Sequence, residues 1–67
     1  MSVWIVENCI DTEREYPKAY STKELALRRV SEILEGQMHS CEDENTWTYG
    51  TYFENFVTIY EVEIDEI

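Results

Sequence analysis

The sequence predicts an α+β fold, a single small domain in which one helix packs on a three- to four-stranded antiparallel or mixed sheet. The chain has 67 residues and is 43% hydrophobic, which suits one globular domain with one small core. Residues 21–36 have apolar side chains at helical spacing, and the segments on both sides alternate as strands do. The expected element order is therefore β-β-α-β-β, with residues 1–67 in a single domain.

The first predicted strand, residues 3–10, has the sequence VWIVENCI and carries apolar side chains on both faces. This pattern is typical of a central strand, or of one whose far face is covered by another element. Residues 11–13 are expected to form a turn. Residues 14–20 then return as a second strand, weakened by Pro17, which has no N–H and fits only an edge strand or a bulge.

The helix is expected to run from Ser21 to Gly36. Ser21 and Glu24 have the spacing of a capping box, and Gly36 can adopt the left-handed conformation that ends a helix. The apolar residues fall on one arc of about 120°, wide enough to pack on a sheet. These residues are Ala26, Leu27, Val30, Ile33 and Leu34.

The polar segment QMHSCEDENT, residues 37–46, is expected to be a loop. Residues 47–53 alternate as a strand, and Glu54-Asn55 is a candidate two-residue turn that lacks the favoured glycine. Residues 56–64, FVTIYEVEI, have the longest strand pattern in the chain. The even positions of this strand are almost continuously apolar, whereas the odd positions begin apolar and end acidic.

A single helix cannot cover both faces of a sheet. We expect Val57 and Ile59, together with one face of the strand at residues 3–10, to lie on the uncovered side. Exposed apolar area of this kind usually marks an interface. The sequence leaves open whether the interface is formed with a second copy of the chain or with another protein.

The formal net charge of −10 lies entirely in the second half of the chain, because no Lys or Arg follows Arg29. Phosphate binding needs cations, so the chain is not expected to bind nucleic acid or an anionic membrane directly. An electrostatic partner would be basic. The sequence has no apolar run of about 20 residues and no signal-peptide pattern, which favours the cytoplasm, where Cys9 and Cys41 stay thiols.

None of the candidate reactive groups predicts catalysis. His39 and Cys41 lack the further ligands of a zinc site and the fixed geometry of a nucleophile pair. Glu61 and Glu63 are expected about 7 Å apart on an open surface, without the burial that raises a carboxyl pKa. The run at residues 42–44 lacks the glycine and the ligand pattern of a calcium loop. We therefore expect no enzyme activity, no metal and no cofactor.

Three segments, VWIVENC, YSTKELALRRVSEILEG and TIYEVEID, resemble a class of small phage and bacterial proteins of unassigned function. Proteins of this class share an N-terminal strand pair, a capped helix and a terminal acidic strand. The resemblance covers most of the chain and implies a phage or mobile-element origin. Phage-encoded inhibitors of host enzymes and defence systems, including anti-CRISPR proteins and uracil-DNA glycosylase inhibitors, are often similarly short and acidic.

The functional hypothesis is a non-catalytic protein-binding module, a phage-encoded inhibitor whose acidic surface mimics nucleic acid and blocks a basic site on a host or defence protein. The alternative is a small structural or regulatory homodimer whose acidity serves solubility. The predicted partner-binding residues form an acidic strand end, an apolar contact and a second acidic patch. They are Glu61, Glu63 and Asp65; Val57 and Ile59; and Glu42, Asp43 and Glu44.

Overall fold

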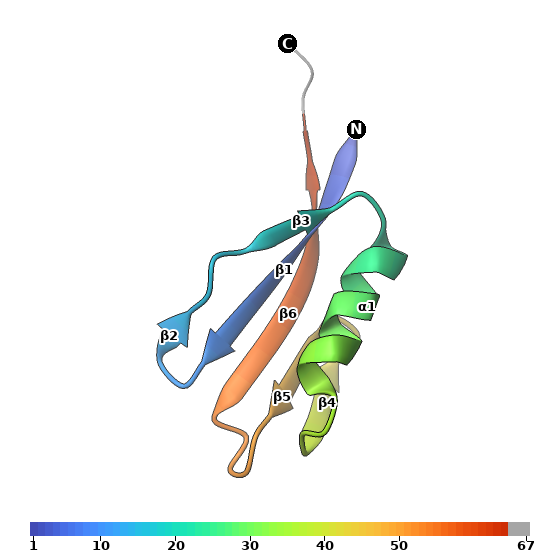
Figure 1. Ribbon diagram of the computed structural model, residues 1–67. Helices are drawn as coiled ribbons and strands as arrows, with labels where there is room; N and C mark the ends of the chain where they lie inside the picture. The colour runs from blue at the N-terminus through green and yellow to red at the C-terminus, as the bar shows by residue number, and fades with distance from the viewer. Residues whose placement is uncertain (65–67) are drawn as a thin grey trace.

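In the computed structural model, which describes residues 1–64, a single helix lies on one face of a six-stranded sheet (Figure 1). The strands are β1 (Ser2–Ile10), β2 (Glu13–Arg14), β3 (Lys18–Tyr20), β4 (His39–Asp43), β5 (Thr46–Tyr49) and β6 (Asn55–Glu63), and the helix is α1 (Lys23–Leu34). The sheet order is β2-β1-β6-β5-β4, with β3 also paired to β1. All pairs are antiparallel, so the α+β class is confirmed and the sheet has more strands than predicted.

The centre of the sheet is the long antiparallel pair of β1 and β6, whose register runs from Ser2 opposite Glu63 to Cys9 opposite Phe56. Both strands were predicted, within one or two residues, from their β-branched and aromatic alternation. β1 is central, as its two apolar faces indicate, because β2 and β3 pair with its other side.

The predicted strand at residues 14–20 is divided into β2 and β3. Pro17 lies between them and has no N–H to contribute to the ladder. Both short strands lie on the outer side of β1, where this interruption is tolerated. The turn between β1 and β2 contains Asp11. The φ of Asp11 is 58°, a left-handed conformation that aspartate tolerates better than most residues.

The expected loop at residues 37–46 is wrong, because His39–Asp43 forms the edge strand β4. All five of its residues are exposed, so its sequence lacks the apolar alternation by which a strand is normally identified. The next strand, β5, ends at Tyr49 rather than at residue 53. A turn at residues 50–54 follows in place of the expected Glu54-Asn55 turn, with positive φ at Gly50 and Phe53 and a 3.2 Å bond from Phe53 N–H to the Gly50 carbonyl.

The helix begins one residue later than predicted, since Thr22 and not Ser21 is the N-cap. Its hydroxyl accepts a 3.2 Å hydrogen bond from the Leu25 N–H. At the other end, Gly36 has a φ of 73° and the Gln37 N–H donates to the Leu34 carbonyl at 3.0 Å, so the predicted glycine stop is confirmed.

Replacing Thr22 with alanine is expected to lower the free energy of unfolding by about 1 kcal/mol, because an N-terminal N–H loses its acceptor. For a chain of this length, that loss corresponds to a fall of several degrees in melting temperature. Ser21→Ala is the matched control, and its melting temperature should stay close to that of the native chain. Thermal unfolding of both variants checks the assignment, and the opposite order of effects would place the cap at Ser21.

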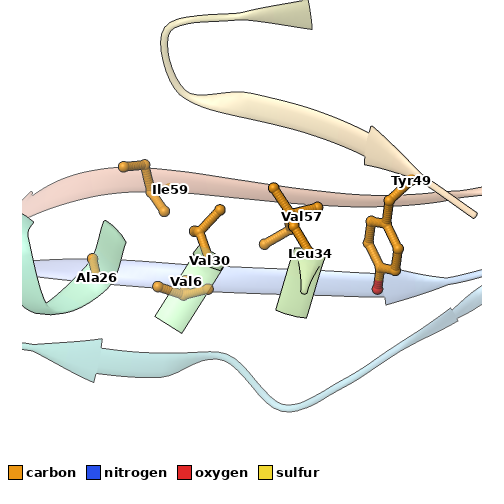
Figure 2. Close-up of a cluster of buried hydrophobic side chains, with 7 residues drawn as sticks. All are labelled: Val6, Ala26, Val30, Leu34, Tyr49, Val57 and Ile59. Carbon is orange, nitrogen blue, oxygen red and sulfur yellow. The ribbon is translucent and has the colours of Figure 1, made fainter. Parts of the chain in front are cut away.

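The core lies between α1 and the sheet (Figure 2). Its helix residues, Ala26, Val30 and Leu34, belong to the predicted apolar face. Val57 and Ile59 are also part of this core, with exposed fractions of 0% and 1%, so the expectation that they lie on the uncovered side is wrong. The uncovered face of β6 instead carries Phe56, Tyr60 and Val62, of which more than a third is exposed.

The unequal length of the helix and the strand explains how one face of β6 can be apolar in its first part and acidic in its second. The 12 residues of α1 span about 18 Å, whereas the nine residues of β6 span about 30 Å. The helix therefore covers only the first part of the odd-numbered face of β6, and the acidic second part of that face extends beyond it. None of the described residues belongs to a helix that is long and apolar enough to cross a membrane.

Candidate protein-binding site

Glu61 and Glu63 lie at the end of β6 that projects beyond α1, beside the start of β1 (Figure 1). Both residues are exposed. Glu61 accepts a 2.7 Å hydrogen bond from the Ser2 hydroxyl, and Glu63 lies 3.5 Å from the N-terminal ammonium group of Met1. This exposed ion pair contributes little to stability. The Lys23 ammonium group lies 5.2 Å from the centre of the Trp4 ring, and Trp4 is opposite Glu61 in the strand register. The third predicted residue of this group, Asp65, lies outside the described residues.

The second predicted patch, residues 42–44, ends β4 and begins the turn to β5. Glu42 accepts a 2.9 Å bond from the Thr48 hydroxyl, and the Asp43 carboxylate accepts a 2.7 Å bond from the Asn45 N–H. Glu44 is exposed in the turn. Two of the three acidic side chains therefore organise the hairpin, in addition to carrying charge.

One backbone contact places the turn of the second acidic group beside the middle of β6. The Ile59 N–H donates a 2.9 Å bond to the Asn45 carbonyl, so the turn lies beside β6 at a point two residues before Glu61. Along a strand, two residues correspond to about 7 Å. Among the described residues, the ion pairs are Met1–Glu63 and Arg29–Glu32, neither of which reaches the turn.

The same end of β6 has an unpaired backbone edge. Pairing with β5 runs from Asn55 to Thr58, and on that side the strand then makes only the Ile59–Asn45 bond. On its other side, β6 remains paired to β1 as far as Glu63. No described strand lies against the outer side of residues 60–63. We call this segment the free edge of β6.

The uncovered face of the sheet is apolar near the free edge. Val3 and Ile5 of β1 lie opposite Val62 and Tyr60 of β6. The Tyr60 hydroxyl donates a 2.8 Å bond to Glu7 on the same face. This bond to a carboxylate raises the pKa of Tyr60, because ionisation would place two negative charges together.

A feature that sequence reasoning missed is a polar network beneath the helix. Asn8, only 8% exposed, donates a 2.6 Å bond from its side-chain N–H to Glu15 and accepts a bond from the Tyr49 hydroxyl. Burial raises the pKa of Tyr49, and the nearby Glu15 carboxylate acts in the same direction. The available signal was an asparagine on the same strand face as the apolar Trp4 and Val6.

This network borders a pocket of about 250 Å³ between α1 and the outer side of β1. The pocket is lined by Val6, Asn8, Glu15, Tyr16, Lys18, Arg29 and Ile33. Its charged lining residues are Lys18, Arg29 and Glu15, and Glu15 is already hydrogen-bonded to Asn8. None of the residues that line the pocket belongs to either predicted acidic group.

His39 and Cys41, expected in a loop, are neighbours on one face of β4. Both are exposed, and each side chain contacts a nearby backbone carbonyl: His39 that of Gln37 at 3.1 Å, and Cys41 that of Asp43 at 2.9 Å. Cys9 is a buried free thiol on β1. Within the described residues, no group of three or more His, Cys, Asp or Glu side chains is arranged to hold a metal ion.

Comparison with known proteins gives no match to a protein-family model, to a curated protein or to a solved structure.

Proposed function

We propose that the chain is a non-catalytic binding protein whose acidic surface occupies a basic, nucleic-acid-binding site on another protein. The observation that carries this proposal is that two acidic segments follow one another along the outer side of β6. The Ile59–Asn45 bond brings the turn containing Glu44 beside the strand that carries Glu61 and Glu63. Neither segment contains Lys or Arg, and Lys23, which lies over Trp4 opposite Glu61, is a cation near the strand end.

The spacing of the carboxylates supports mimicry of nucleic acid. Alternate residues of a strand lie about 6.6–7 Å apart, which is comparable with successive phosphates along an extended nucleic-acid strand. Glu61 and Glu63 have this spacing on one face of β6. A cationic groove that holds phosphates would therefore also accept this strand end, and the negative field would speed the encounter.

The apolar part of the contact differs from the sequence hypothesis. Val57 and Ile59 are buried under the helix and are unable to touch a partner. Tyr60 and Val62, next to the glutamates in the chain and on the opposite face of β6, have exposed fractions of 39% and 37%. We propose that these two residues supply the apolar contact after electrostatic encounter. An origin of the inhibitor in a phage remains a prediction from the sequence.

Charge reversal at the strand end tests this function. The double variant Glu61→Lys/Glu63→Lys is compared with Glu13→Lys/Glu35→Lys, which makes the same change in net charge at exposed positions toward the other end of the sheet. Proteins retained from a nuclease-treated bacterial lysate by the native chain are purified. Each is then assayed for displacement of a fluorescent DNA duplex by the native chain and by both variants.

The native chain and the control variant are expected to displace the duplex, whereas the strand-end variant should be weaker by about tenfold or more. Exposed pairs contribute up to about 1 kcal/mol each, and 1.4 kcal/mol corresponds to a factor of ten. The native affinity should also fall as salt is raised. Equal displacement by both variants, or displacement that salt does not affect, would contradict the proposal.

The apolar uncovered face of the sheet favours a second candidate, a homodimer in which two such faces pack together. Phe56, Tyr60 and Val62 are each more than a third exposed, and Val3 and Ile5 lie beside them. Light scattering separates the candidates, because a homodimer would have twice the chain mass of 8.0 kDa. A monomer across the working concentration range would remove this alternative.

A further inference from the structure

We infer that the free edge of β6 binds an extended basic segment of the partner protein as an additional strand of the sheet. This inference rests on the proposed function and specifies how the partner is engaged. Strand addition to an exposed edge is a common mode of peptide recognition, in which backbone hydrogen bonds provide affinity and alternate side chains provide specificity.

The hydrogen bonds at both ends of the free edge define which backbone groups point outward. The Ile64 N–H donates to the Met1 carbonyl at 2.7 Å, toward β1, whereas the Ile59 N–H donates to Asn45, away from β1. Backbone groups alternate in direction along a strand. The N–H and C=O groups of Glu61 and Glu63 therefore face outward, with no strand partner among the described residues.

The free edge is already in the conformation that a strand partner requires. Pairing with β1 holds residues 60–63 extended, so binding would order little of this chain. The turn at Glu44–Asn45 lies beside Ile59 and limits the free edge on the side of β5. A segment added here would continue the sheet beyond Thr58, where the pairing of β5 with β6 stops.

Charge identifies the occupant. The helix-side positions of the free edge are Glu61 and Glu63, and Glu44 lies in the adjoining turn, whereas the opposite face carries the apolar Tyr60 and Val62. A matching strand has Lys or Arg at alternate positions and apolar residues between them. Opposite charges across a strand pair stabilise it, and like charges destabilise it.

A second copy of this chain does not fit the same edge. Any antiparallel pairing of the free edge with itself brings a glutamate of one copy opposite or diagonal to a glutamate of the other. Charged residues on exposed edges also protect proteins against self-pairing. If the glutamates served only to prevent self-pairing, a basic segment would not form backbone hydrogen bonds with the free edge.

The probe is a synthetic peptide of alternating lysine and valine, and the matched control has the same composition with the two residue types in separate blocks. The alternating peptide is expected to shift the amide resonances of Glu61 and Glu63 in the labelled chain. It should also slow hydrogen exchange of these amides by about tenfold or more. Tyr60 and Val62 are internal references, because their amides face β1 before the peptide is added.

Two variants separate backbone pairing from charge. Glu61→Gln removes the charge and keeps the outward N–H, whereas Glu61→Pro removes both and leaves the ladder with β1 intact, because this N–H does not point toward β1. The proline variant is expected to bind the alternating peptide about tenfold more weakly than the glutamine variant. Equal affinity of the two variants would overturn the inference. If the proline variant does not fold, the exchange measurement on the native chain decides alone.

The outcomes distinguish this inference from the proposed function. Unchanged exchange at Glu61 and Glu63 in saturating peptide, together with salt-dependent displacement of the DNA duplex, overturns strand addition and leaves the proposed function in place. Equal protection by the alternating and block peptides also overturns it, because charge without an extended pattern would then suffice. Edge protection without any displacement of nucleic acid would support strand addition and contradict the proposed function.

Discussion

Replacing Ile59 with alanine is expected to lower the free energy of unfolding by about 2–5 kcal/mol, which is a large part of the total for a chain of this length. Ile59 is 1% exposed and packs in the core with Val6, Val30 and Val57. The substitution removes buried apolar surface and leaves a cavity that a small core is poorly able to fill. Urea unfolding followed by circular dichroism measures the effect as a fall in the midpoint.

The matched control is the same substitution at Ile64, whose side chain is 42% exposed just beyond the end of β6. Ile64→Ala is expected to lower stability by much less, because less buried surface is lost. A loss at Ile64 that equals or exceeds the loss at Ile59 would contradict the placement of Ile59 in the core. The comparison therefore tests directly which side of β6 belongs to the core.

Replacing Tyr49 with phenylalanine is expected to cost about 1–3 kcal/mol at neutral pH. The Tyr49 hydroxyl donates to Asn8, and its removal leaves the buried side-chain oxygen of Asn8 without this partner. The same urea titration measures the loss. Tyr60→Phe is the control, since the hydroxyl of Tyr60 donates to Glu7 at an exposed site, and its loss should be smaller.

The stability of Tyr49→Phe is also expected to depend on pH differently from that of the native chain. Burial raises the pKa of Tyr49 above its ordinary value of about 10, so the folded state holds the phenol proton more tightly than the unfolded state. Its stabilising contribution is complete below pH 10 and is lost as pH rises through the raised pKa. The urea midpoint of the native chain should therefore fall more steeply above pH 10 than that of Tyr49→Phe. Parallel curves would show that Tyr49 does not contribute to the pH dependence.

The sequence predicted those parts of the fold in which apolar periodicity and packing agree. The central strands, the helix and its apolar face have strong patterns, because each buries one or both faces. β4 was missed because a strand that is exposed along its whole length needs no apolar residues. The N-cap was displaced by one residue because Ser21 and Thr22 are both good caps, and the backbone decides between them.

The sequence predicted the negative charge of the candidate site, but it did not predict how the acidic and apolar residues are arranged in space. Glu61 and Glu63 lie on the strand end where their alternation places them, and the structure adds that the turn containing Glu44 lies beside that strand. Alternation shows that β6 has two faces, but it does not show which face the helix covers. Val57 and Ile59 were therefore placed on the wrong side. The pairing of distant strands and the length of the helix decide this, and neither follows from a local pattern.

The pairing of β1 with β6 also determines how this chain reaches its folded state. These are the first and last strands of the described chain, and together they form its longest ladder. Contacts between segments far apart in sequence form slowly, because the intervening chain loses entropy before the ladder stabilises it. During synthesis, β1 therefore waits until β6 has been made. Until then its apolar faces are available to chaperones and to other nascent chains, and folding is completed by the same strand that carries the acidic binding end.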